Sequence, residues 1–279
     1  MLNLILALLI GAPAGGLAVS TEGVAVSEAP QAIILPHHLL VERDIDEFYK
    51  QVSEARPRPE RILLISPNHF GRGRSYVQST STPYGNYRDV LKFDLATINE
   101  LFSNRIADLE PETFFHDHGI NVHYTYLLKY FPSAEIVPIV VKPEATEAVL
   151  ERLVGSLSQL DSQETLVIAS IDFTHNDTEE FALKNDQRII DWLNAWSISR
   201  KDEVVTGKTK LTEITSLKPS LGSPEGIAMD SPESLYTLIR LLEEWKSPSS
   251  VNIWKRTSSA MFFPNVSPAD MTSHLFVAL

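Results

Sequence analysis

The chain has 279 residues, of which 43% are apolar, and its formal net charge is −12 at pH 7. The apolar fraction is sufficient for a globular core, and the length fits one large domain or two small ones. The negative charge argues against a nucleic-acid partner, which would require a basic face. The sequence contains no cysteine, which excludes disulfides, thiolate metal ligands and a cysteine nucleophile.

The N-terminal residues 2–18 are almost wholly apolar and carry no charged side chain. A secretory signal peptide has an apolar core of this length, and residues 18–20 (AVS) have the pattern of a cleavage site. The lack of Lys and Arg, and the interrupting glycines and proline, argue against a signal and against a transmembrane helix. The alternatives are a cytoplasmic protein and an exported or tethered one, with membrane contact only through this run. We expect a leader and linker over 1–29 and one α/β domain over 30–279.

The downstream sequence alternates between apolar runs and helical patterns. We expect strands over residues 31–35, 62–65, 76–78, 135–141, 165–170, 251–258 and 275–279. We expect helices over residues 41–55, 94–102, 121–131, 146–160 and 179–196, and a further helix beginning at Asp230-Ser231-Pro232. The polar stretch 201–220 gives no clear assignment. This alternation predicts a three-layer α/β/α fold, with a mostly parallel central sheet and helices on both faces.

Three of the expected buried strands are each followed by a histidine. His37 follows the run 32–35, His69 follows 62–65, and His175 follows 165–170. Open α/β sheets place their ligands at the carboxyl ends of parallel strands. We therefore expect the three imidazoles to meet at one edge of the sheet.

Two histidines and a carboxylate from different loops are typical of a non-haem iron site or a similar divalent site with open positions. By position, His37 and His69 are the best imidazole ligands. Asp230 is the candidate third ligand. The alternative is that Asp230 only caps the helix that follows it, a contribution of about 1 kcal/mol.

Other polar residues could support this site. Asp172 and His175 form a D-x-x-H pair suited to orienting a ring and moving a proton, or else a buried pair that fixes a turn. His118 and His123 flank the start of a helix and are candidates for proton transfer or for orienting ligands, with helix capping as the alternative. The remaining candidates are His38, Asn68, Arg72, Arg74, His116 and Asp117, several of which also fit an ordinary solvated loop.

Four short motifs resemble a known family when they are taken together. They are residues 33–37 (IILPH), 66–69 (SPNH), 117–120 (DHGI) with His123, and 170–175 (SIDFTH). Their order and spacing are similar to those of the Memo family, which includes the proteins called AmmeMemoRadiSam system protein B. The resemblance covers about residues 30–279.

This resemblance implies an α/β domain similar to the class III extradiol (LigB-type) non-haem iron dioxygenases, with a metal on the positions of His37 and His69. The family's third ligand is commonly a cysteine, where this chain has Ala228, and a glutamate of its histidine segment is replaced by Asn121. If Asp230 takes over as ligand, the site has two imidazoles and a carboxylate. That set favours iron and weakens the case for copper, which prefers soft ligands; zinc also remains an option.

The first functional hypothesis is a metal-dependent oxidoreductase, dioxygenase-like, that acts on an unidentified small molecule. The alternatives are a hydrolase in which the metal lowers the pKa of bound water, and a non-catalytic metal-binding or protein-interaction scaffold. The resemblance also implies membership of an AmmeMemoRadiSam-type system, with a radical-SAM protein and an AMMECR-type protein as partners.

Overall fold

The computed structural model describes residues 25–26, 28–82, 91–201, 207–217, 226–247 and 250–279. Most of the expected leader, residues 1–24, therefore lies outside the described residues. Among the helices that the structure describes, none is long and apolar enough to cross a membrane.

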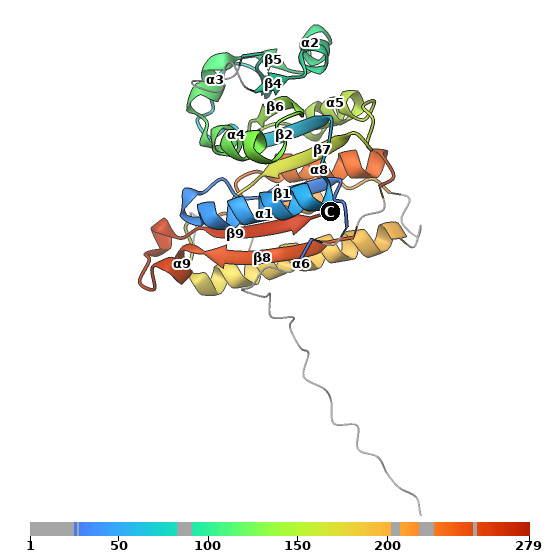
Figure 1. Cartoon of the computed structure of the whole chain (residues 1–279). Helices are drawn as coiled ribbons and strands as arrows, with labels where there is room; N and C mark the ends of the chain where they lie inside the picture. The colour runs from blue at the N-terminus through green and yellow to red at the C-terminus, as the bar shows by residue number, and fades with distance from the viewer. Residues whose placement is uncertain (1–24, 27, 83–90, 202–206, 218–225, 248–249) are drawn as a thin grey trace, which may run out of the picture.

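The strands of the described residues form one nine-stranded mixed sheet (Figure 1). They are β1 (Ala32–Leu35), β2 (Arg61–Pro67), β3 (Val77–Ser79), β4 (Lys92–Phe93), β5 (Asp108–Leu109), β6 (Glu135–Val141), β7 (Thr165–Ser170), β8 (Asn252–Ser258) and β9 (Ser273–Ala278). The main path runs β5-β3-β6-β2-β7-β1-β9-β8, with β4 paired to β6. The four central strands β6, β2, β7 and β1 are mutually parallel, whereas β3, β9 and β8 pair antiparallel to their inner neighbours.

Helices cover both faces of this sheet (Figure 1). Within the described residues, the α-helices are α1 (Glu42–Ala55), α2 (Leu95–Ser103), α3 (Pro111–His116), α4 (His118–Tyr130), α5 (Glu147–Leu157), α6 (Glu179–Lys201), α7 (Leu211–Thr215), α8 (Pro232–Glu244) and α9 (Ser259–Phe262), and 3₁₀ turns lie at Leu39–Val41 and Pro268–Asp270. Helices α1 and α4 pack together on one face, and α8 crosses the other face with α5 beside it. The expected mostly parallel α/β sheet with helices on both faces is confirmed.

The central strands are buried along almost their whole length, as expected for parallel strands covered on both faces. Helix α1 buries its apolar stripe, Ile45, Phe48, Tyr49 and Val52, against this core. Because β1, β7 and β2 are neighbours and run parallel, their carboxyl ends lie side by side. This edge of the sheet carries the polar cluster described next.

Candidate metal centre

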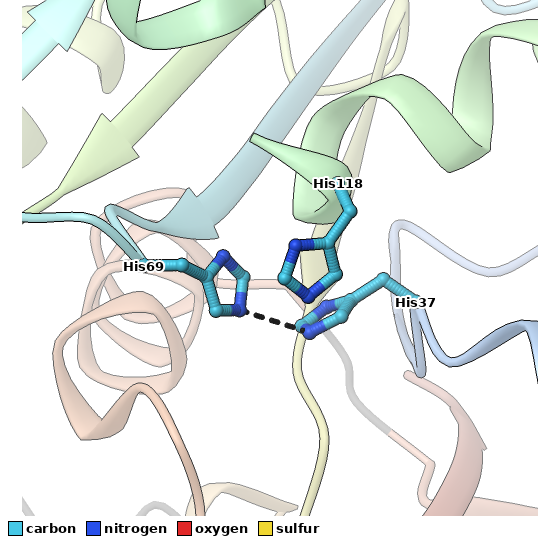
Figure 2. Close-up of side chains that lie close together, drawn as sticks. All are labelled: His37, His69 and His118. Carbon is cyan, nitrogen blue, oxygen red and sulfur yellow. Dashed lines mark hydrogen bonds between the residues drawn. The ribbon is translucent and has the colours of Figure 1, made fainter. Parts of the chain in front are cut away.

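The imidazoles of His37 and His69 meet at the carboxyl edge of the sheet (Figure 2). A proline precedes each histidine where its strand ends. Pro36 lies just after β1 and precedes His37, and Pro67 is the last residue of β2 and lies two residues before His69. A proline cannot donate to the sheet ladder, so the chain leaves the sheet at these points. The two Nε2 atoms are 3.1 Å apart, and His37 is only 2% exposed.

Asp230 provides a carboxylate to the same point. Its Oδ2 lies 3.2 Å from His37 Nε2 and 3.6 Å from His69 Nε2. The alternative that Asp230 caps α8 is wrong, because Ser231 is the cap and accepts a hydrogen bond from the Ser234 N–H. The carboxylate is held in place by the Asp172 N–H, which donates to Oδ2 at 3.3 Å.

Asp117 determines the tautomer of His69. Its Oδ1 lies 2.8 Å from His69 Nδ1, and its Oδ2 accepts from the His69 N–H at 3.0 Å. A carboxylate only accepts, so Nδ1 carries a proton, and in the neutral ring the lone pair of Nε2 faces His37 and Asp230. Burial of the ring opposes its charge, but Asp117 and Asp230 outweigh burial and raise the pKa of His69 to about 10. The surroundings of this ring therefore favour positive charge.

His37 has an equivalent partner on its other nitrogen. Its Nδ1 lies 2.9 Å from Ser170 Oγ, and the Ser170 hydroxyl donates to the Gly119 carbonyl at 2.7 Å. With the hydroxyl proton directed at that carbonyl, His37 Nδ1 donates, and in the neutral ring Nε2 carries the lone pair. Burial opposes protonation of His37, but Asp172 and Asp230 raise its pKa above the usual value.

Three potential ligand atoms thus converge: His37 Nε2, His69 Nε2 and Asp230 Oδ2. A triangle whose sides are the three separations of 3.1, 3.2 and 3.6 Å has a circumscribed radius of about 1.9 Å. This radius is slightly shorter than the ~2.0–2.2 Å at which metal ions bind imidazole nitrogen and carboxylate oxygen. His37, His69 and Asp230 would therefore hold a single ion through these three atoms without a large rearrangement. The donor set fits a divalent cation.

His118 is the third imidazole at this point (Figure 2). It begins α4, and its ring centroid lies 4.1 Å from that of His69 and 5.1 Å from that of His37. One nitrogen of His118 lies close enough to join the other two rings around an ion. Burial, together with the neighbouring rings, lowers the pKa of His118 to about 4. It is neutral at pH 7, so it can bind a metal or accept a proton.

Asp172 and His175, expected to act together, contact different groups. Asp172 faces His37: its Oδ1 accepts from the His37 N–H at 3.2 Å, and its Oδ2 lies 3.5 Å from His37 Nε2. With His37 and Asp230 it forms a second group able to hold an ion. His175 Nδ1 contacts Thr272 Oγ1 at 3.2 Å, whereas His175 Nε2 is buried with no hydrogen-bond partner. Burial lowers the pKa of His175, which favours the neutral ring.

His123 is linked to His37 Nδ1 through Ser170 instead of lying beside His37 at the proposed centre. Its ring is fully buried and contacts Ser170 and Tyr49. Burial and the neighbouring His37 lower the pKa of His123 to about 3. The catalytic roles expected for His118, His123, Asp172 and His175 stay predictions.

The other candidates lie at the margin. His38 Nδ1 accepts from the Leu40 N–H and caps a 3₁₀ turn, and His116 is exposed at the end of α3. The side chain of Asn68 holds its own loop through the backbone of Arg72, and Arg72 and Arg74 are exposed.

His274, which was not among the expected site residues, is fully buried on β9. Its ring centroid lies 5.3 Å from that of His38, and its Nε2 has no hydrogen-bond partner. The antiparallel pairing of β9 with β1 brings it to this edge. No local motif marks that pairing.

The fold and the site define an α/β protein with a candidate His–His–carboxylate metal centre. The family profile described as "Memo-like protein" matches residues 18–215, so the chain belongs to the Memo-like family. It is 29% identical over 169 residues to a MEMO1 family protein of Saccharolobus solfataricus and 30% identical over 169 residues to one of Saccharolobus islandicus. Each alignment covers 58% of this chain and 58% of the relative, so the chain matches little more than half the length of these relatives.

The fold is also similar to a solved structure, that of an uncharacterized protein of Escherichia coli K12, JW3007. The TM-score is 0.52, and the match covers 88% of this chain and 98% of that one. The sequences are 16% identical, so this likeness concerns the fold alone.

Proposed function

We propose that this protein is a mononuclear non-haem metal enzyme, with His37, His69 and Asp230 as the metal ligands. The observation that carries the proposal is the convergence of three potential ligand atoms, two ring nitrogens and one carboxylate oxygen, within 3.1–3.6 Å of one another. Such an arrangement costs electrostatic energy unless a cation or a proton occupies it. Two imidazoles and one carboxylate match the facial set of non-haem iron oxygenases.

We propose an oxidoreductase reaction of the dioxygenase type on a small molecule. A bound iron would supply redox chemistry and open positions for oxygen and substrate. Iron is favoured over copper because position 228 is alanine, which provides no thiolate. The site's own residues handle protons: His175 presents a buried, unpaired Nε2, and His118 presents a neutral ring beside the two ligand rings.

The test begins with element analysis of protein purified without added metal. We then expect His69→Ala to abolish stoichiometric metal binding, while the matched variant His116→Ala, at an exposed histidine, retains it. After anaerobic loading with Fe(II), oxygen uptake in the presence of small phenolic compounds supports the oxidoreductase. Metal-dependent ester or amide hydrolysis without oxygen uptake favours the hydrolase instead. Wild-type protein that retains no metal overturns the proposed centre.

The family resemblance also supports a proposal about partners, namely a radical-SAM protein and an AMMECR-type protein of the same modification system. A binding measurement between the purified proteins tests it. Binding to such a partner that survives His69→Ala, with no turnover by either protein alone, favours the scaffold alternative.

A further inference from the structure

A buried chain of hydrogen bonds leads from Tyr49 on α1 to His37 Nδ1, the ring nitrogen that does not face His69 and Asp230. Tyr49 Oη lies 3.0 Å from His123 Nδ1, His123 Nε2 lies 2.9 Å from Ser170 Oγ, and Ser170 Oγ lies 2.9 Å from His37 Nδ1. All four side chains are at most 2% exposed. They come from α1, α4, the end of β7 and the loop after β1, so the fold assembles this chain from four separate segments.

The positions of the protons follow from what each atom can do. The Gly119 carbonyl only accepts, and it lies 2.7 Å from Ser170 Oγ, closer than either ring nitrogen. With its single proton directed there, Ser170 accepts from both rings, so His123 is protonated on Nε2 and His37 on Nδ1. His123 Nδ1 is then an acceptor, and Tyr49, whose pKa is raised by burial, remains a phenol and donates to it.

The opposite tautomer of His37 would disable the proposed centre. A proton on His37 Nε2 would point at His69 Nε2 and Asp230 Oδ2, which lie 3.1 and 3.2 Å away. Both can accept it, so this tautomer has partners of its own inside the site. The choice between the tautomers of His37 therefore depends on the group that is hydrogen-bonded to its Nδ1.

We propose that Ser170, oriented by Gly119 and by the Tyr49–His123 pair, is the positioning residue that keeps His37 protonated on Nδ1, so that Nε2 is free to bind a metal. This inference rests on the proposed metal centre. Partners behind a ligating histidine typically change metal affinity by about 10–100-fold when they are removed. Ser170 does not itself contact the proposed ion, and its effect passes through the ring of His37.

The test measures Zn²⁺ affinity by competition with a chelator. We expect Ser170→Ala to weaken binding by about 10–100-fold. The matched variant is Ser79→Ala, which removes a buried hydroxyl that donates to the Pro138 carbonyl of β6. Ser79 lies on β3, and β6 separates β3 from β2, so this variant should bind Zn²⁺ as the wild type does. Wild-type protein that binds no Zn²⁺ overturns the metal centre itself. Wild-type affinity in Ser170→Ala overturns only the role of Ser170.

A spectroscopic readout separates positioning from a general structural effect. In Zn²⁺-loaded protein with ¹⁵N-labelled histidine, we expect His37 to show a protonated Nδ1 and His123 a protonated Nε2. Tyr49→Phe should change the His123 signals and weaken Zn²⁺ binding less than Ser170→Ala does. Tyr124→Phe, at a buried tyrosine of α4 that packs against Phe93, should do neither. His37 protonated on Nε2, or unchanged His123 signals in Tyr49→Phe, overturns the proposed chain.

Discussion

Asp117 shows how one residue can serve structure and chemistry together. It caps α4 by accepting from the Gly119 N–H at 3.0 Å, and it holds the ring and the backbone of His69. Because it is fully buried, its charge acts on His69 with little screening from solvent. Asn is an equally good helix cap but is neutral, so Asp117→Asn separates the two roles.

At this scale we predict how the stability of the metal-free protein depends on pH. The folded-state pKa of His69 is about 10, above its ordinary value of 6.5. The stabilisation from its protonation is therefore fully present below about pH 6.5 and is lost as the pH rises through 10. While the ring titrates, one proton corresponds to about 1.4 kcal/mol per pH unit. Urea unfolding in the presence of a chelator at pH 6.5, 8 and 9.5 measures this loss.

Asp117→Asn is the control for this prediction, since it removes one of the two charges that raise the pKa of His69 while it keeps the cap of α4. We expect a flatter pH profile in that variant. Stability that stays constant or rises between pH 6.5 and 9.5 in the wild type would show that His69 has no raised pKa.

Some residues of the site could be predicted from the sequence, and others could not. His37 and His69 could be found because each directly follows a buried strand, and their convergence needs only parallel neighbours. The choice between ligand and cap for Asp230 could not be made, because Ser231 beside it is an equally good cap. His274 and the roles of Ser170 and Tyr49 depend on contacts between distant segments, which no local pattern records.

Helix α4 approaches the end of β2 very closely, and Gly119 makes this possible. A Cβ at Gly119 would overlap Ser66 Oγ and would lie 2.8 Å from His69 Cε1. The helix therefore begins directly against the ligand ring, with Asp117 as its cap and His118 as its first residue. Any side chain at position 119 would require Ser66 and His69, or the start of α4, to move.

We predict that Gly119→Ala displaces the start of α4 and disrupts the centre. Zn²⁺ affinity should fall by at least about tenfold, which is the effect typical of losing a hydrogen-bond partner of a ligating histidine. The reason is that both Asp117 and the Gly119 carbonyl would move. Overpacking should also cost about 1–3 kcal/mol of stability. Zn²⁺ titration and thermal unfolding measure the two effects.

Gly155→Ala provides a matched control inside helix α5. A Cβ there would meet nothing within 4 Å, so the change should leave metal binding intact. It should also stabilise the protein by about 0.5–1 kcal/mol, because alanine is the better helix former. Equal effects of the two substitutions would mean that the close approach at Gly119 is unimportant.

The elements themselves were well predicted where their pattern is strong. The bounds of β6 and β7 agree with the predicted strands, and α1 begins one residue after its predicted start. The short strands β4 and β5 and the helices α3, α7 and α9 have too few residues to show a period. Helix α4 was predicted to begin at 121, three residues late, because its first turn carries polar residues that serve the site instead of the apolar face.

At the scale of the whole molecule, the candidate centre joins three separate parts of the chain. His37 follows β1, His69 follows β2, and Asp230 precedes α8, which packs on the opposite face of the sheet from α1 and α4. The alternation of strands and helices was enough to predict the parallel centre of the sheet. It could not predict that β9 returns antiparallel beside β1, because strand pairing between the chain's two ends leaves no local signal.

A metal that links these three parts should stabilise the whole fold, since the unfolded chain does not hold the ligands together. For one site that binds only the folded state, Zn²⁺ at 100 times its dissociation constant adds about 2.7 kcal/mol. Asp230→Asn should give a smaller increase at the same Zn²⁺ concentration, because a neutral amide binds the ion more weakly than a carboxylate does. His116→Ala should keep the full increase.

Urea unfolding with and without Zn²⁺ measures all three proteins, and an equal increase in Asp230→Asn and the wild type would remove Asp230 from the ligand set. Because the fold of Asp230→Asn keeps Ser231 as the cap of α8, any loss of the metal effect in this variant reports on ligation and not on the helix.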